Sequence, residues 1–409
     1  MRHASATNAP KSGGHVRSLE GLRGLATVAV IGYHFGVLGS RGGYLGVDIF
    51  FVLSGFVVMR SLSRSVGSPG WKRQFFVRRC ARLVPAIVPV LLFAALWSAW
   101  KTPGIDSGET AALIGAATMN YNLARLALRA NGELIHLWSL AIEWHFYLAA
   151  PLLIRLFANR RRGAGLVLGG AGLVLLSRFS LVGTSRVEPM TAYLATWFRL
   201  DGLLIGTALA LCSPVTLRRI GPRLSSVALA VLGALVAAGP VWYSKPLISL
   251  LITIPTATFA TAIVVAALAS GTAPRRIEQV LSSRPLIALG ERSYSLYLWH
   301  YVVGVVVLGN GSEAFQGIVK LVLQLAATFA AGWLSYGLIE RPGRRLLTEK
   351  LRPHEKRHAP SVAAVTSETM WASRGRPGFT PLLRSTTPPD SLPWGDRNRQ
   401  PLSGRPFQR

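Results

Sequence analysis

The sequence predicts an all-α integral membrane protein with about ten transmembrane helices and both termini in the cytoplasm. Half of the 409 residues are hydrophobic and only 15% are charged, whereas a soluble domain carries about a quarter charged residues. The mean hydropathy is positive, at +0.38. Runs of about twenty apolar residues recur along the chain, and each is long enough to cross a bilayer as a helix.

Ten of these runs are the predicted spans. An eleventh, 111–128, contains Asn120, Asn122 and Arg125 and is predicted to be an interfacial or re-entrant segment. Short cytoplasmic loops are rich in Lys and Arg. With ten spans and the N-terminus inside, the inner loops hold 17 basic residues and the outer loops seven, Arg178 among them. The ten spans are 22–39, 44–62, 83–100, 139–157, 163–182, 191–211, 222–243, 247–270, 286–309 and 315–338.

The net charge of +28 is explained by this loop asymmetry and a basic tail, so no nucleic-acid partner is predicted. Residues 1–16 are predicted to be a disordered N-terminal segment and 17–348 the transmembrane domain. Residues 349–409 are predicted to be a disordered, basic, Pro-rich cytoplasmic tail, because they cannot bury enough apolar surface to fold alone. Cys80 and Cys212 are too few for a disulfide framework or a zinc site, and no metal is expected.

Basic side chains within the spans lie toward the predicted cytoplasmic face. Arg23 opens the first span. Arg79 and Arg82 lead into the third, three positions apart and therefore on one helix face. We expect these three arginines to form a compact anion-binding surface. Arg73 and Arg78 are interpreted as positive-inside anchors that extend to lipid headgroups.

Acidic and imidazole side chains form a second group in the outer half of the predicted bilayer. Ionisable groups inside a span are costly, which makes each a functional hypothesis, and buried carboxylates need partners. In the sixth span, Arg199 and Asp201 are too close in sequence to face each other on a helix, so each needs a partner elsewhere. Attachment of one helix to another and direct chemistry both explain Asp48, Arg199 and Asp201. The members of this second group are His34, Asp48, Glu143, His145 and His300.

Seven segments, in order, resemble the motifs of the membrane-bound acyltransferase-3 family, which O-acylates bacterial surface polysaccharides, Nod factors and macrolides. LEGLRGLATVAVIGYHF, which contains Arg23 and His34, is similar to the family's Arg-x10-His signature. The second-helix, Arg-x-x-Arg and Trp-Ser-Leu…Glu…Phe-Tyr-Leu motifs are matched by GGYLGVDIFFVLSGFVV, FFVRRCARLVPA and HLWSLAIEWHFYLAAPLL. The series is completed by FRLDGLLIG, SYSLYLWH and IERPGRR, and the resemblance covers residues 17–345.

The resemblance implies an enzyme that moves an acyl group, acetyl by default, from cytoplasmic acyl-CoA to a hydroxyl group, with no permanently bound cofactor. His34 would take the proton from the acceptor hydroxyl as it attacks the thioester. Asp48 or Glu143 would orient the His34 ring and stabilise the imidazolium that forms. The phosphates of acyl-CoA would be held by Arg23, Arg79 and Arg82.

Some features of the sequence leave the mechanism open. Position 145 is His where the family usually has Gln, and the oxyanion stabiliser is not identified. Ser54 is a candidate acyl carrier in a two-step mechanism, but direct transfer is preferred because small residues more often mark close helix packing. No exported hydrolase-like domain follows the last span, so we expect the membrane domain itself to engage the acceptor. Supporting roles are assigned to Arg199, Asp201, Ser293, Tyr294 and His300.

The acceptor is predicted to be a cell-surface or lipid-linked glycan, because the catalytic residues lie toward the outer half of the bilayer. A macrolide or another small hydroxylated metabolite is the alternative. The Arg, Ala and Gly content is typical of a GC-rich bacterial genome, so the predicted location is the lipid bilayer of the bacterial inner membrane. A secondary transporter or flippase would show related halves or broken helices, and neither is apparent. A scaffold would not need Arg23, His34, Asp48 and Glu143 in lipid.

Overall fold

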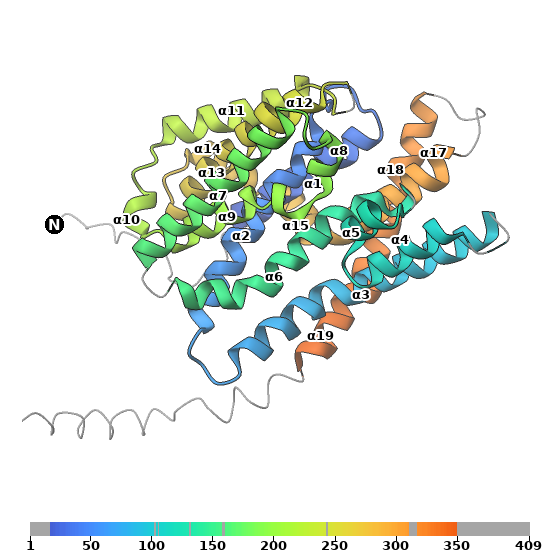
Figure 1. The fold of residues 1–409 in the computed structure, drawn as a ribbon, viewed down its shortest axis with the longest axis horizontal. Coiled ribbons are helices and arrows are strands. Elements are labelled where there is room, and N and C mark those ends of the chain that lie inside the picture. Colours follow the sequence, from blue (N-terminus) through green and yellow to red (C-terminus); the bar gives the residue numbers. More distant parts are fainter. Residues whose placement is uncertain are drawn as a thin grey trace, which may run out of the picture. The chain divides into compact units, whose positions relative to one another are not determined.

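The computed structural model describes residues 17–101, 104, 106–130, 132–157, 160–242, 244–310 and 317–349. Within these ranges every regular element is a helix (Figure 1), as predicted for an all-α protein. The predicted N-terminal segment, 1–16, lies outside the described residues, and so does the predicted tail except for Glu349.

The N-terminal part of the chain supplies the helices that carry most of the predicted site residues. They are α1 (Arg17–His34), α2 (Gly46–Ser65), α3 (Trp71–Lys101), α4 (Ser107–Ala117), α5 (Tyr121–Ala127), α6 (Trp138–Leu156), α7 (Arg160–Val182), α8 (Pro189–Leu194) and α9 (Asp201–Leu211). Short 3₁₀ segments precede α2, α6 and α9. They are η1 (Gly43–Leu45), η2 (Gly132–Leu137) and η3 (Thr196–Phe198).

The C-terminal part combines short helices with three rods that contain π-helical turns. The short helices are α10 (Pro214–Leu217), α11 (Pro222–Ala238), α14 (Arg275–Leu281) and α15 (Arg284–Glu291). One rod consists of α12 (Pro246–Ile248), η4 (Ser249–Thr253) and α13 (Ile254–Ser270). The second consists of α16 (Ser293–Trp299), η5 (His300–Val307) and α17 (Leu308–Asn310). The third consists of α18 (Ile318–Ser335), η6 (Tyr336–Glu340) and α19 (Arg341–Glu349).

Six helices in the described part of the chain are long and apolar enough to cross a membrane, and they support a multi-pass membrane protein. The six are Gly43–Ser65, Trp71–Lys101, Gly132–Leu156, Arg162–Val182, Pro246–Ser270 and Ile318–Glu349. Three more apolar helices are shorter, namely Asp201–Leu211, Pro222–Ala238 and Ser293–Val307. The first predicted span corresponds to α1, whose 18 residues include Arg17, Glu20 and Arg23. Ten crossings and two cytoplasmic termini stay predictions.

The sixth predicted span, 191–211, is not one continuous helix. The chain leaves the helix at Ala195, makes the 3₁₀ turn η3 and begins α9 only at Asp201. Arg199 therefore lies in the break, at φ −125° and ψ 7°. The predicted interfacial segment 111–128 is also divided, into α4 and α5.

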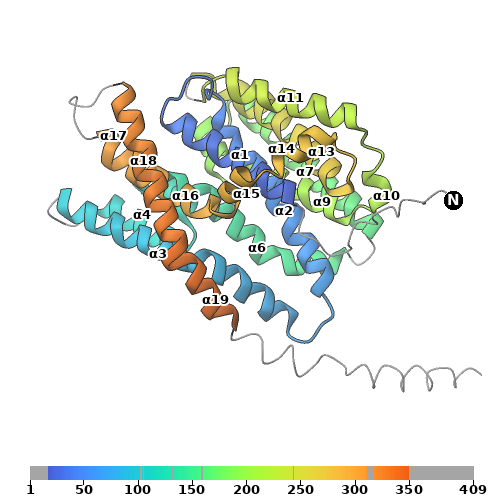
Figure 2. The same cartoon turned by 180° about the vertical axis from the view of Figure 1, so that it is seen from behind.

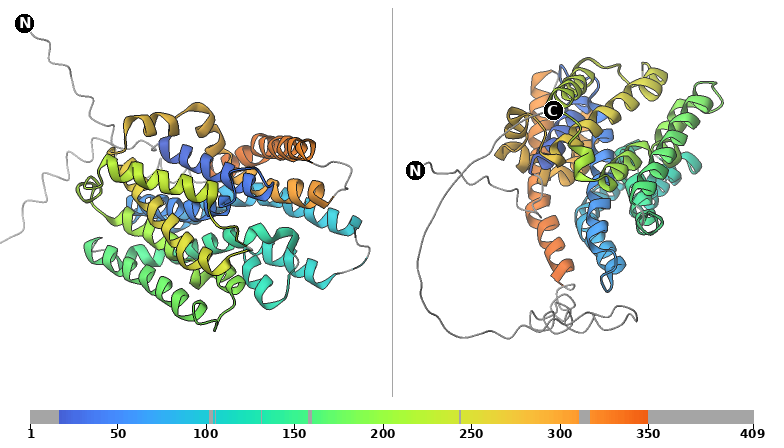
Figure 3. Two further views of the ribbon diagram at one scale, coloured as in Figure 1. Left: turned by 90° about the horizontal axis from the view of Figure 1, so that it is seen from above. Right: turned by 90° about the vertical axis from the view of Figure 1, so that its left-hand side faces the viewer.

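Helix α2 lies at the centre of the bundle and packs against α1, α6, α9 and α13 (Figure 1). Seen from behind, α18 and α19 form one rod along α3 (Figure 2), and α19 packs against α3. From above, α7 and the α18–α19 rod lie on opposite sides of the bundle (Figure 3). The outer face of α3 leaves Leu96 and Trp100 72% and 74% exposed, which suits a surface covered by lipid.

The contact between α2 and α9 depends on two glycines. A Cβ atom at Gly55 would lie 2.1 Å from the Leu203 carbonyl oxygen, and one at Gly206 would lie 2.1 Å from the Val52 carbonyl oxygen. Small residues at such positions let two membrane helices approach closely. This close approach sets the position of α2, from which Asp48 and Ser54 extend toward the site.

Gly206→Val is expected to force α9 away from α2 and to destabilise the protein by about 1–3 kcal/mol, the usual cost of overpacking. The thermal midpoint of the purified protein in detergent measures this effect. Gly169→Val on α7 is the matched control, because a Cβ atom there meets nothing within 4 Å. Equal midpoints for the two variants would contradict the close packing of α2 and α9.

Candidate active site

His34 lies at the C-terminal end of α1 and its ring tautomer is set by the backbone. Its Nδ1 atom is 2.9 Å from the Val30 carbonyl oxygen. A carbonyl oxygen can only accept a hydrogen bond, so Nδ1 carries the proton and Nε2 keeps its lone pair. The half-buried His34 ring therefore presents a nitrogen that can accept a proton.

His300 is the second group that contacts the His34 ring. Its Nδ1 atom lies 2.5 Å from the Tyr297 carbonyl oxygen, and its Nε2 atom lies 3.3 Å from His34 Nδ1. By the same reasoning His300 Nδ1 is the donor and His300 Nε2 is an acceptor facing His34 Nδ1–H. The ring centroids are 5.0 Å apart. His300, predicted as a supporting residue, is fully buried and holds the His34 ring in place.

The structure gives the carboxylates of Asp48 and Glu143 hydrogen-bond partners other than His34. Asp48 Oδ1 accepts from Arg199 Nη2 at 2.8 Å. Glu143 accepts from Ser54 Oγ at 2.6 Å and from the Tyr147 hydroxyl at 2.8 Å. Neither carboxylate orients His34 here, in contrast to the role implied by the resemblance. The Val30 carbonyl and His300 occupy the positions that such a carboxylate would take.

Two buried ion pairs join α2, α7 and the break before α9. Arg199 pairs with Asp48, and Arg178 Nη2 donates to Asp201 Oδ2 at 2.9 Å. Both guanidinium groups are 0% exposed. Arg199 and Asp201 thus find separate partners, as the spacing predicted, and these contacts favour attachment of one helix to another. The assignment of Arg178 to an outer loop was wrong, because this residue lies within α7 and is buried.

Arginines from several helices gather around one cavity of about 740 Å³, here called the basic cavity. Arg23, Arg79 and Arg82 all line it, as the predicted anion-binding surface requires. Arg78, interpreted from the sequence as a lipid anchor, lines it as well. Sequence reasoning missed three more arginines, although the first precedes SYSLYLWH and the others lie in IERPGRR. They are Arg292, Arg341 and Arg344.

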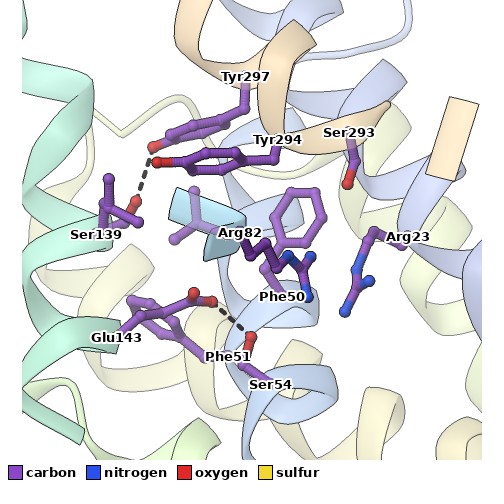
Figure 4. A pocket seen from close by; sticks show the side chains of 12 residues that line it. Arg23, Phe50, Phe51, Ser54, Arg82, Ser139, Glu143, Ser293, Tyr294 and Tyr297 are labelled. Carbon is purple, nitrogen blue, oxygen red and sulfur yellow. Dashed lines mark hydrogen bonds between the residues drawn. The ribbon is translucent and has the colours of Figure 1, made fainter. Parts of the chain in front are cut away.

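A second cavity, here called the middle cavity, borders the basic cavity, and Figure 4 shows its lining from close by. Arg23, Arg82 and Tyr294 line both. In the close-up the guanidinium groups of Arg23 and Arg82 point into the space that the bonded pair Ser54 and Glu143 borders. Predicted residues Ser293 and Tyr294 also line this middle cavity. Hydroxyl, carboxylate and guanidinium groups therefore converge between α1, α2, α3, α6 and α16.

His34 opens into a third cavity of about 390 Å³, here called the aromatic cavity. Val47 and Tyr297 line both the middle and the aromatic cavity. Two of its aromatic rings, Tyr193 and Trp242, have centroids 4.1 Å apart. The other polar or aromatic side chains of its lining are Tyr33, Tyr44, His136, Trp138 and Tyr301.

His145, the departure from the family pattern, has two hydrogen-bond partners. Its Nδ1 atom lies 2.8 Å from Thr196 Oγ1 and its Nε2 atom 2.9 Å from Asn120 Oδ1. The imidazole therefore ties α6 to η3 and to the turn before α5. Within the described residues no group of three or more His, Cys, Asp and Glu side chains is placed to hold a metal ion.

Residues 16–337 match the model of a protein family, acyltransferase-3, which is described as an acyltransferase domain. The chain belongs to the acyltransferase-3 family. It is 30% identical over 363 residues to the peptidoglycan O-acetyltransferase OatA of Listeria monocytogenes serovar 1/2a, covering 81% of this chain and 56% of that protein. It is 29% identical to the O-acetyltransferase OatA of Staphylococcus aureus strain NCTC 8325, covering 81% and 57%.

The chain thus spans little more than half the length of these relatives. No solved structure matches it. Its family membership supports acyl transfer as the activity, and six of its helices are long and apolar enough to cross a membrane. Membership favours acyl transfer over the transporter and scaffold alternatives.

Asp48→Ala leaves the Arg199 guanidinium buried without its carboxylate, so we expect a loss of about 3–5 kcal/mol of stability. The thermal midpoint in detergent measures it, and the double variant Asp48→Leu with Arg199→Met is expected to recover much of the loss. Lys101→Ala is the control, because Lys101 pairs with Glu133 while 48% exposed and such pairs contribute about 0–1 kcal/mol. Equal losses for Asp48→Ala and Lys101→Ala would contradict a structural role for the buried pair.

Proposed function

We propose that the protein moves an acyl group, acetyl by default, from cytoplasmic acyl-CoA to a hydroxyl group of a cell-surface or lipid-linked glycan. The observation that carries this proposal is the succession of three cavities. The basic and middle cavities share Arg23, Arg82 and Tyr294, and the middle and aromatic cavities share Val47 and Tyr297. A long donor with phosphates at one end and a thioester at the other suits such a succession.

In this proposal the basic cavity holds the phosphates of acyl-CoA. Seven arginines line it, and their planar guanidinium groups donate paired hydrogen bonds that match phosphate oxygens. Three acidic residues, Glu20, Glu291 and Glu340, lie among them. The lining therefore keeps a net positive charge suited to an anion.

His34 acts as the general base in the proposed reaction. Its Nε2 atom takes the proton of the acceptor hydroxyl while the hydroxyl oxygen forms a bond to the thioester carbonyl carbon. The carbon–sulfur bond then breaks, and the proton passes from His34 to the departing thiolate. The Val30 carbonyl oxygen accepts a hydrogen bond from His34 Nδ1–H. It thereby stabilises the His34 imidazolium that exists between these two steps.

The acceptor site in this proposal is the aromatic cavity, because it contains His34. The names of the two OatA relatives describe O-acetyltransferases, one of them acting on peptidoglycan, and they support a glycan. The aromatic lining also suits a macrolide or other small hydroxylated metabolite, which is the second candidate. The proposed location is the inner membrane of a bacterium.

His34→Ala is expected to slow acyl transfer strongly while the protein stays folded, since the half-buried ring lies at the end of α1. Loss of a general base lowers the rate by about 10²–10⁴-fold. The measurement is mass spectrometry of glycans, lipids and secreted metabolites from cells with matched membrane levels of wild type and variant. An O-acyl product that reaches the wild-type level in the variant would contradict the role of His34, and the identity of the product separates a glycan from a metabolite acceptor.

Arg82→Gln is expected to raise the KM for acetyl-CoA by about 10–100-fold, because one charge-assisted hydrogen bond contributes about 1.5–3 kcal/mol. Steady-state transfer of radiolabelled acetyl groups by membranes measures it. Arg73→Gln is the matched control, since Arg73 is exposed on the same helix and does not line the cavity. A KM unchanged in Arg82→Gln, or raised equally in both variants, would contradict phosphate binding in the basic cavity.

A further inference from the structure

His136 is a buried histidine that the mechanism above does not use. It belongs to η2, just before α6, and is 3% exposed. Neither of its ring nitrogens makes a hydrogen bond of normal geometry among the described residues, and the nearest backbone partner is Leu298. A buried polar group without a partner destabilises the folded state, so its presence in a native protein suggests a function. The ring lines the aromatic cavity together with His34.

The His136 ring is held in place without the use of either nitrogen. It stacks on Tyr301, with ring centroids 5.0 Å apart and an interplanar angle of 21°. Its backbone carbonyl oxygen accepts a hydrogen bond from the Tyr297 hydroxyl at 2.6 Å. The plane of the ring and the position of its backbone are therefore fixed. Both nitrogens are buried in the wall of the cavity, and neither is bonded to another side chain.

His136 and His34 each lie close to the same two neighbouring rings, those of His300 and Tyr301. The His300 centroid is 5.7 Å from that of His136 and 5.0 Å from that of His34. The Tyr301 centroid is 5.0 Å from that of His136 and 5.4 Å from that of His34. Two imidazoles thus line one cavity whose described lining contains no carboxylate. One of them, His34, is the proposed base.

We propose that His136 is a catalytic residue that donates a hydrogen bond to the oxyanion of the tetrahedral intermediate. This proposal rests on the proposed function. As the acceptor oxygen adds to the thioester carbonyl carbon, the carbonyl π electrons move to oxygen, and the N–H of a neutral His136 stabilises that negative charge. When the carbonyl re-forms, the carbon–sulfur bond breaks and the thiolate takes the proton from His34. His136 keeps its own proton throughout.

Apolar and aromatic surroundings strengthen such a donor, because few other dipoles compete for the developing charge. A neutral imidazole is also well suited to the position beside His34. It offers one donor and one acceptor, whereas a permanent cation there would disfavour protonation of the neighbouring base.

The test uses the full-length protein in nanodiscs, with acetyl-CoA as donor and isolated peptidoglycan glycan strands as acceptor probe. Loss of one oxyanion donor lowers kcat by about 10²–10³-fold, and we expect this for His136→Ala with both KM values nearly unchanged. His136→Gln is expected to recover part of kcat, because its amide group again offers an N–H donor. Thermal midpoints within a few degrees of wild type are expected for His136→Gln, which keeps a polar side chain of similar reach.

The matched control is His145→Gln, a histidine on the neighbouring helix α6 whose ring contacts Asn120 and Thr196 and lines none of the three cavities. It is expected to transfer acetyl groups at the wild-type rate. Three results would overturn the proposal: an unchanged kcat in His136→Ala, a loss confined to the KM of the glycan strands, or no recovery in a folded His136→Gln. A wild type that transfers no acetyl group from acetyl-CoA would instead overturn the proposed function on which this role rests.

Discussion

The burial of two arginine–aspartate pairs inside an apolar bundle is the constraint on which the site depends. A buried charge is tolerated only when it is paired and hydrogen-bonded. Arg199 satisfies this by reaching from the break before α9 to Asp48 on α2, and Arg178 by reaching from α7 to Asp201. The α9 helix is thereby attached to both neighbours. Arg199 also lies under the ring of Tyr193, 5.0 Å from its centroid, so the same pair supports one wall of the aromatic cavity.

The types of side chain that line the three cavities change from one cavity to the next. Guanidinium groups dominate the basic cavity, a carboxylate and hydroxyl groups join them in the middle cavity, and rings dominate the aromatic cavity. The imidazole of His34 lies in the last of these. Its tautomer is fixed by the Val30 carbonyl, one helical turn earlier in the same helix. The base therefore needs no carboxylate partner to present its Nε2 lone pair.

The sequence predicted the helical class and most of the residues that meet at the site, because depth along a helix can be counted directly from residue number. The direction in which a side chain points around that helix cannot be counted so easily. Asp48, Glu143 and His34 were therefore placed together by depth, yet the two carboxylates bond to other groups. Arg178 was counted with the outer loop because it lies only four residues before the end of its helix, and the count of charges could not show that its side chain is buried against Asp201. His136 was missed because a lone histidine beside a Trp-Ser-Leu motif has no periodic signal of its own.

In the proposed reaction one donor molecule extends from the basic cavity to His34. The deciding measurement is a cryo-electron microscopy structure of the full-length protein with bound CoA. We expect the phosphates to lie against Arg23, Arg79 and Arg82, the pantetheine arm to pass through the middle cavity, and the sulfur atom to lie beside His34. Phosphates bound elsewhere, or a sulfur atom that ends far from His34, would contradict it.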